Sequence, residues 1–133
     1  MRTPVIVVAG QGDTDAVVRA MLRNPGSLAV AHHFDGQVVL RTDTTLRHGV
    51  VATAEVALEL VHGCVSCTVR NDLLVHLRQL HRRDDVRRVV IHLAPWLEPE
   101  PVWAINHVRA RVGPGYVDGP ATQDVSIAAC DVY

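Results

Sequence analysis

Short apolar runs alternate with amphipathic segments along this chain. Residues 4–9 (PVIVVA) form a continuous apolar run rich in β-branched side chains, which predicts a strand buried on both faces. The run stops at a glycine turn, residues 10–12 (GQG), and Asp13 follows as a candidate helix N-cap. The apolar face of this helix would comprise Val17, Val18, Met21 and Leu22. The opening of the chain therefore predicts a strand, a glycine turn and a helix that ends at residues 24–26 (NPG).

The rest of the chain continues the alternation. Further strands or extended pieces are predicted at residues 28–32, 38–40, 88–93 and 125–130. Residues 50–61 fit a helix and a pair of extended pieces equally well. After a loop at residues 63–67, Asn71 or Asp72 is expected to cap a helix that ends near residues 84–85. The remaining predictions are a loop at residues 95–101 and a helix at residues 102–112.

This order of elements predicts an α/β domain with a mainly parallel sheet and helices on both faces. A chain of 133 residues fits one small domain, residues 1–133. The sequence stops directly after a core-type strand, so we expect an N-terminal part of a longer protein. No signal peptide or membrane-length apolar stretch is found, which predicts a cytoplasmic protein without a membrane partner. The net charge of −1 provides no overall attraction to nucleic acid, and no DNA partner is expected.

All 13 basic residues are arginine, so the chain contains no lysine. The glycine turn after the first strand has the position of a phosphate-binding loop, but a working loop needs a lysine and a hydroxyl on magnesium. Here the turn is short, and Asp13 and Asp15 stand where phosphate charge would lie. Two like charges about 4 Å apart repel by roughly 4 kcal/mol at an effective dielectric of about 20. We therefore interpret Gly10, Gly12 and Thr14 as a vestigial nucleotide site or a purely structural turn.

The pair Cys64 and Cys67 has the CxxC spacing that lets two thiolates meet one zinc ion, with His62 as a further ligand. Structural zinc needs four ligands, and the only other thiol is Cys130. A redox pair at the start of a helix is a second interpretation. The third is that both cysteines are small residues lining a loop.

A cluster of arginines spans the end of the predicted second helix and the start of the next strand. It could contact RNA phosphates, or it could be a solvated face paired with Asp84 and Asp85. Its members are Arg78, Arg82, Arg83, Arg87 and Arg88.

Residues 59–73 (ELVHGCVSCTVRNDL) resemble the ELxNGCxCCTVRxDL signature of the CobW-like (CobW/HypB/UreG-type) P-loop GTPases, a family that handles metals. Residues 24–26, 29–36 (AVAHHFDG), 97–102 (LEPEPV) and 125–131 follow the order of other family segments. The resemblance covers roughly residues 5–131. It implies a P-loop NTPase-like, Rossmann-like three-layer fold and a link to zinc.

Several departures from the family pattern fall on its chemistry. The loop lacks the phosphate-binding lysine, and Ser66 replaces the middle cysteine of CxCC. His92 occupies the position of the glutamate in the family's ETTG segment, and His33 occupies that of the acidic residue in its NEFG segment. The N-terminal string MRTPVIVVAGQGDTDAV is similar to a non-catalytic branch of the family that recruits a protein Y-type hibernation factor to ribosomes under zinc starvation.

The resemblance therefore implies a domain that does not hydrolyse GTP and acts as a binding or recruitment factor in zinc homeostasis, with the ribosome or a hibernation factor as partner. The alternative is a zinc metallochaperone of the GTPase type that still binds metal and nucleotide.

Overall fold

The computed structural model describes residues 3–96, 108–112 and 125–132. Within these ranges two helices and seven strands follow one another along the chain. Their bounds are β1 (Thr3–Gly10), α1 (Thr14–Leu22), β2 (Ser27–Phe34), β3 (Val39–Arg47), β4 (Val50–Leu58), α2 (Val65–His81), β5 (Arg88–His92), β6 (Val108–Val112) and β7 (Val125–Val132). None of the described helices is both long and apolar enough to span a bilayer.

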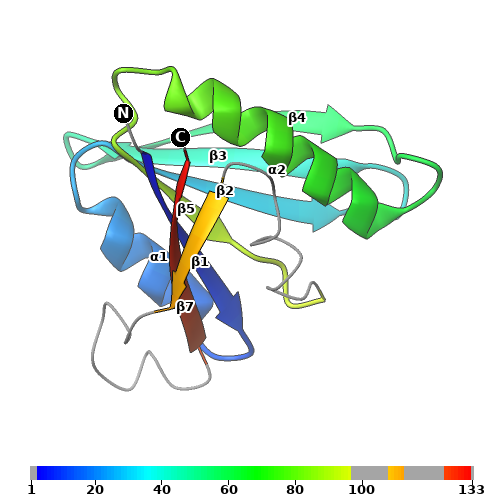
Figure 1. Cartoon of the computed structure of the whole chain (residues 1–133), viewed down its shortest axis with the longest axis horizontal. Coiled ribbons are helices and arrows are strands. Elements are labelled where there is room, and N and C mark those ends of the chain that lie inside the picture. Colours follow the sequence, from blue (N-terminus) through cyan, green and yellow to red (C-terminus); the bar gives the residue numbers. More distant parts are fainter. Residues whose placement is uncertain (1–2, 97–107, 113–124, 133) are drawn as a thin grey trace.

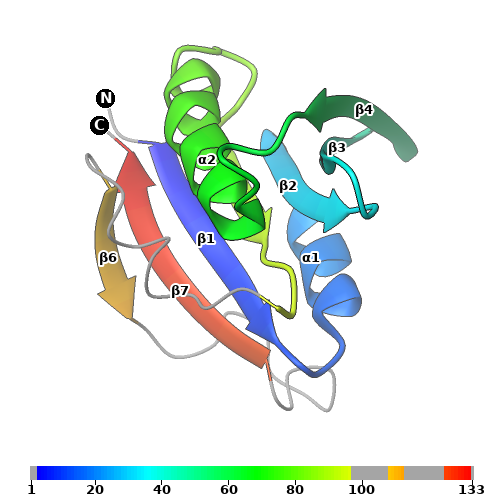
Figure 2. The same cartoon turned by 90° about the vertical axis from the view of Figure 1, so that its right-hand side faces the viewer.

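All seven strands belong to one sheet, in the order β4-β3-β2-β5-β1-β7-β6. Parallel pairing is confined to the centre, where β5 lies between β2 and β1. The hairpin β3–β4 extends the sheet on one side, and β7 and β6 extend it on the other, all by antiparallel pairing (Figure 2). The predicted α/β class is confirmed. The expectation of a mainly parallel sheet is corrected, because the described sheet is mixed, with two parallel pairings at its centre and four antiparallel pairings around them.

The two helices cover opposite faces of the sheet (Figure 1). Alternate residues of β1 divide between two cores because successive side chains of a strand point to opposite faces. Val5 and Val7 pack with the α2 residues Val69, Leu73, Leu77 and Leu80. Ile6 and Val8 pack with the α1 residues Val17, Val18, Met21 and Leu22. The three-layer arrangement is thus confirmed, and the apolar face predicted for α1 is the face that it buries.

The start of α2 corrects one sequence expectation. Neither Asn71 nor Asp72 caps this helix; its N-cap is Cys64, whose Sγ accepts a hydrogen bond from the backbone N–H of Cys67. Cysteine is not among the common N-cap residues, so the helical pattern alone pointed to the later polar residues. Asp72 faces the sheet instead. The helix also ends at His81, before the expected residues 84–85.

Two further segments were ambiguous or wrongly predicted. Residues 50–58 form strand β4, because His48 and Gly49 both have positive φ and close a two-residue hairpin with β3. Residues 108–112 form strand β6, not the end of a helix over 102–112; the sequence VRARV alternates with the period of a strand. Residues 102–107 and most of the predicted loop at 95–101 lie outside the described residues.

Candidate functional site

The glycine turn lies between the carboxyl end of β1 and the first turn of α1. Two backbone donors at this turn and the start of α1 are used within the chain. The N–H of Thr14 donates to the carbonyl of Gly12 at 2.9 Å, and the N–H of Ala16 donates to Asp13 Oδ1 at 3.0 Å. The carboxylate of Asp13 thus occupies the end of the helix, where a bound phosphate would sit in a P-loop protein.

The hydroxyl of Thr14 is also engaged inside the protein. Its Oγ1 lies 2.8 Å from Nε2 of His92 at the end of β5, and His92 Nδ1 lies 3.6 Å from Asp15 Oδ1. The parallel pairing of β1 with β5 brings these ends together. Gly10, Gly12 and Thr14 lie at this turn, and the hydroxyl that would contact magnesium in this family contacts a histidine. The residues present do not fit a magnesium–triphosphate group.

Cys64 and Cys67 are joined by a disulfide at the N-terminus of α2. Both side chains are half-buried, whereas His62, Gly63 and Ser66 around them are exposed. His62 and Gly63 both have positive φ and form a tight turn closed by the bridge between Val61 and Cys64. The structure thus brings Cys64, Cys67 and His62, the residues considered as zinc ligands, together in one turn.

The cysteine turn does not form a complete zinc site. Among the described residues, no group of three or more histidine, cysteine, aspartate or glutamate side chains could hold a metal ion. A disulfide has no thiolate to donate, and even after reduction Cys64, Cys67 and His62 would supply at most three of four tetrahedral ligands. Zinc binding here requires reduction and at least one donor from outside this set.

In the part of the chain that the structure describes, the side chains of two members of the predicted arginine cluster are hydrogen-bonded and those of the other three are not. Arg83 donates twice to Asp85, at 3.0 and 2.7 Å, and Arg88 donates to Ser27 Oγ at 3.2 Å and to the carbonyl of Met21 at 2.6 Å. Arg78, Arg82 and Arg87 are exposed, and their side chains have no polar partner within the part of the chain that the structure describes.

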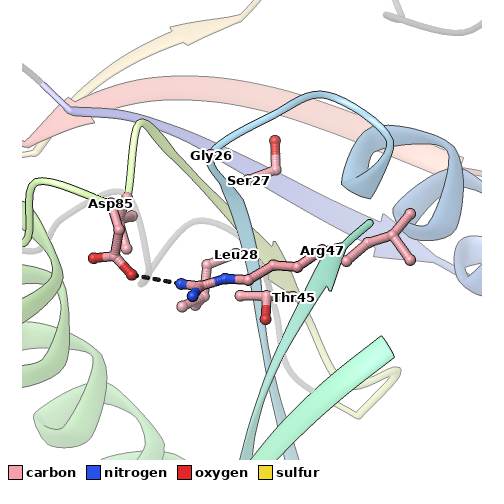
Figure 3. Close-up of a pocket in the computed structure, with 8 residues that line it drawn as sticks. Gly26, Ser27, Leu28, Thr45, Arg47 and Asp85 are labelled. Atoms are coloured by element: carbon pink, nitrogen blue, oxygen red, sulfur yellow. Dashed lines mark hydrogen bonds and ion pairs between the residues drawn. The ribbon is translucent and has the colours of Figure 1, made fainter. Parts of the chain in front are cut away.

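Asp85 also closes a small pocket of about 130 Å³ between β2, β3 and the segment before β5. Figure 3 shows Arg47 reaching from β3 across this pocket to Asp85, with Nη2 2.7 Å from Oδ2. The hydrogen bond from Arg83 lowers the pKa of Asp85 to about 2, and Arg47 acts in the same direction. The carboxylate therefore stays charged and neutralises part of the arginine cluster.

The cysteine pair and the arginine cluster lie at opposite ends of α2. A helix of 17 residues is roughly 25 Å long, so one small ligand cannot touch both sets. The glycine turn lies on the other face of the sheet with α1. The three predicted sets are thus separate sites, each with its own chemistry.

Sequence reasoning missed a buried polar network between α2 and the sheet. Asp72 of α2 accepts a hydrogen bond from Arg41 Nη1 at 2.6 Å and lies 2.7 Å from His32 Nε2. One turn further along α2, His76 Nε2 lies 2.9 Å from Asp43 Oδ2. The signal was present: Arg41 and Asp43 are two apart on one strand, and Asp72 and His76 are four apart on one helix, so each pair shares a face.

Burial and ion pairing shift the pKa of Asp72 in opposite directions. Burial would raise the pKa of its carboxyl, but the hydrogen bond from His32 and the charge of Arg41 outweigh this and hold the pKa below its usual value of 3.8. Among the described residues, the buried atoms Arg41 Nε and His76 Nδ1 have no hydrogen-bond partner. The network therefore fixes α2 against β2 and β3 at some energetic cost, which is typical of buried ion pairs.

A three-layer α/β domain with a glycine turn from its first strand into its first helix is the architecture of the P-loop NTPase-like class. The CobW/HypB/UreG, nucleotide-binding domain family matches residues 10–132, and the chain belongs to this family.

Similar proteins come from mycobacteria. The chain is 63% identical over 130 residues to a Mycobacterium tuberculosis protein named Zinc chaperone Rv0106, and equally to Uncharacterized protein Mb0109 of Mycobacterium bovis. Each match covers 97% of this chain and 33% of the relative, so the chain spans about one third of the length of these relatives. No solved structure matches the chain significantly.

Proposed function

We propose that this domain is a non-catalytic CobW-family module that acts as a binding or recruitment factor in zinc homeostasis. Its site of action in this proposal is the ribosome, in the cytoplasm, under zinc starvation, with a protein Y-type hibernation factor as a further partner. The observation that carries the proposal is the carboxylate of Asp13 at the start of α1, where the family would bind phosphate.

The case against nucleotide turnover rests on the negative charge at the start of α1 and on the absence of lysine from the chain. Asp13 at the N-cap and Asp15 in the first turn place two negative charges at the start of α1, and the chain has no lysine to offset a triphosphate. Removing water from such a site would strengthen the repulsion between carboxylates and phosphate. Phosphoryl transfer depends on cations that neutralise developing charge, and the glycine turn provides none.

The link to zinc rests on the family and on the name of one relative, which describes that protein as a zinc chaperone. In this chain Cys64 and Cys67 offer two neighbouring thiolates once their disulfide is reduced, and His62 is adjacent. Soft thiolates favour zinc over harder cations such as magnesium. In the proposal zinc is a ligand that the cysteine turn shares with a partner, because the turn alone has too few donors.

The surface proposed to meet the ribosome is the unpaired part of the arginine cluster. Arg78, Arg82 and Arg87 present guanidinium groups to solvent at the C-terminal end of α2 and just beyond it. Guanidinium groups bind phosphate oxygens in a bidentate manner. Because the chain's net charge is −1, such binding would be local and sensitive to salt.

Co-sedimentation with purified ribosomes at low and moderate salt tests this proposal. We expect pelleting at low salt that decreases at the higher salt, because phosphate contacts release counterions. The double variant Arg78→Gln/Arg82→Gln should pellet at least severalfold less. Its matched control is Arg19→Gln/Arg70→Gln, which removes two exposed arginines from elsewhere on the helices. Absence of pelleting by the unmodified chain at low salt, or equal loss in both double variants, would contradict the proposed surface.

The second candidate is a zinc metallochaperone that still binds nucleotide, which the printed name of the relative favours. Isothermal titration of the chain with GTP and magnesium distinguishes it. Micromolar binding would favour this candidate, whereas the two carboxylates at the start of α1 predict no measurable heat. A parallel titration with a sulfate or phosphate salt controls for anion binding at the start of α1.

A further inference from the structure

We infer that Cys64 and Cys67 form a redox-active pair that undergoes thiol–disulfide exchange with a low-molecular-weight thiol and its disulfide. The pair is placed for exchange and not for structural reinforcement. It joins residues only three apart in sequence, and a disulfide that closes so short a loop constrains the unfolded chain least.

The turn that carries the cysteines is held together without the disulfide. The buried side chain of Thr68 donates to the carbonyl of Cys64 at 2.8 Å and accepts from the N–H of Val61 at 2.8 Å. Cys64 N–H also donates to the carbonyl of Val61 at 2.9 Å. Because these bonds are made by the backbone and Thr68, the S–S bond can open while the start of α2 keeps its conformation.

The surroundings favour Cys64 as the exchanging sulfur. Its Sγ accepts the backbone N–H of Cys67 at 3.2 Å and lies 3.5 Å from the hydroxyl of Ser66. Both contacts, together with the positive end of the α2 dipole, stabilise negative charge on that sulfur. The exposed residues His62, Gly63 and Ser66 leave the turn open to a small thiol.

The exchange balances as a two-electron step. In the reduced chain the thiolate of Cys64 attacks one sulfur of an external disulfide, forming a mixed disulfide and releasing one external thiolate. The thiolate of Cys67 then attacks Cys64 Sγ, the intramolecular bond forms, and the second external thiolate leaves. The chain has lost two electrons and two protons, and one external disulfide has become two thiols. Reduction runs through the same steps in reverse.

This exchange does not depend on zinc, ribosome binding or nucleotide, so it goes beyond the proposed function and can fail independently of it. Reversible disulfides in reducing compartments are typically catalytic or regulatory. Oxidation would remove both thiolates from any metal, so the same turn cannot be oxidised and metal-bound at once.

The experiment equilibrates the metal-free 133-residue chain with mixtures of glutathione and glutathione disulfide, followed by acid quenching, alkylation and peptide mapping. We expect the Cys64–Cys67 bond to form and to be lost again as the ratio is reversed, with Cys130 remaining alkylatable or singly modified throughout. Cys67→Ser should trap the mixed disulfide on Cys64 at least tenfold faster than Cys64→Ser traps it on Cys67. Circular dichroism should show the same helix content in both states.

Three outcomes would overturn the inference. One is a bond that stays intact under excess glutathione until the chain is unfolded, which would mark it as structural. Another is separate mixed disulfides on both cysteines without the intramolecular bond. The third is equal trapping rates in the two serine variants, which would remove the special role of Cys64.

Discussion

The carboxylate of Asp13 accepts a hydrogen bond from the backbone N–H of Ala16, three residues further along α1. This contact stabilises the helix and at the same time puts a negative charge at the point where a P-loop protein binds phosphate. One side chain therefore accounts for both the stability of the turn and its lack of fit for a triphosphate.

Replacing Asp13 tests the first of these roles. We expect Asp13→Ala to lower the free energy of unfolding by about 1 kcal/mol, because an N-cap acceptor is lost. Asp13→Asn should cost only a few tenths of a kcal/mol, since asparagine keeps the acceptor. Urea unfolding followed by circular dichroism measures both variants. Equal costs for alanine and asparagine would show that the cap is unimportant.

Removing Asp72 should be among the most destabilising changes on α2. Asp72→Ala leaves Arg41 as a largely buried cation without its nearest counterion, and breaking such a pair costs about 3 to 5 kcal/mol. The matched control is Asp84→Ala, which removes an exposed carboxylate just beyond the same helix and should change stability by less than about 0.5 kcal/mol. Denaturant midpoints for the two variants decide the comparison.

The same carboxylate predicts an acid dependence of stability. The folded pKa of Asp72 lies below the unfolded value of 3.8, so its contribution is complete above that pH and is lost as pH falls through the lower folded value. The difference in unfolding free energy between the unmodified chain and Asp72→Asn should therefore shrink as pH falls below about 4. Urea titrations at pH 6 to 3, on the order of half a unit apart, would reveal it. A difference that does not change with pH would contradict the lowered pKa.

Shortening a buried side chain of α2 should lower the free energy of unfolding far more than shortening an exposed side chain of the same helix. Leu73 is 0% exposed in the core against the sheet, and Leu73→Ala should cost about 2 to 5 kcal/mol. Val75, two residues further along, is 55% exposed, and Val75→Ala should change stability by less than about 0.5 kcal/mol. Thermal unfolding of both variants gives the ranking; similar losses would place the core elsewhere.

Zinc uptake should require the reduced state of the cysteine turn. We expect the reduced chain to bind zinc weakly and the oxidised chain not to bind it, because a disulfide has no thiolate to donate. Cys64→Ser should lower the affinity of the reduced chain by more than about tenfold, whereas Cys130→Ser should leave it unchanged. Competition with a chromophoric zinc chelator measures all of these. Equal uptake by oxidised and reduced chains would exclude the cysteines as ligands.

Sequence patterns predicted the elements whose burial follows a regular period. The run PVIVVA and the spacing from Val17 to Leu22 predicted β1 and α1, and the order of elements predicted an α/β domain with helices on both faces. The hydrophobic pattern was less informative where a segment fitted both the helical and the strand period. Residues 50–58 became a strand because the turn at His48 and Gly49 pairs them with β3, and VRARV at 108–112 is a strand because it alternates.

By itself, the sequence determined the composition of the glycine turn: it has no lysine, and two carboxylates stand at the start of α1. The sequence is sufficient here because the residues that would repel phosphate are neighbours in the chain. Only the tertiary structure decided that Cys64 begins α2, that Thr14 contacts His92, and that Arg41 pairs with Asp72. Arg41 and Asp72 are 31 residues apart, and Thr14 and His92 are 78 apart. Periodicity reveals which face of an element is buried, but the partner that meets a polar side chain there depends on how distant strands and helices pack.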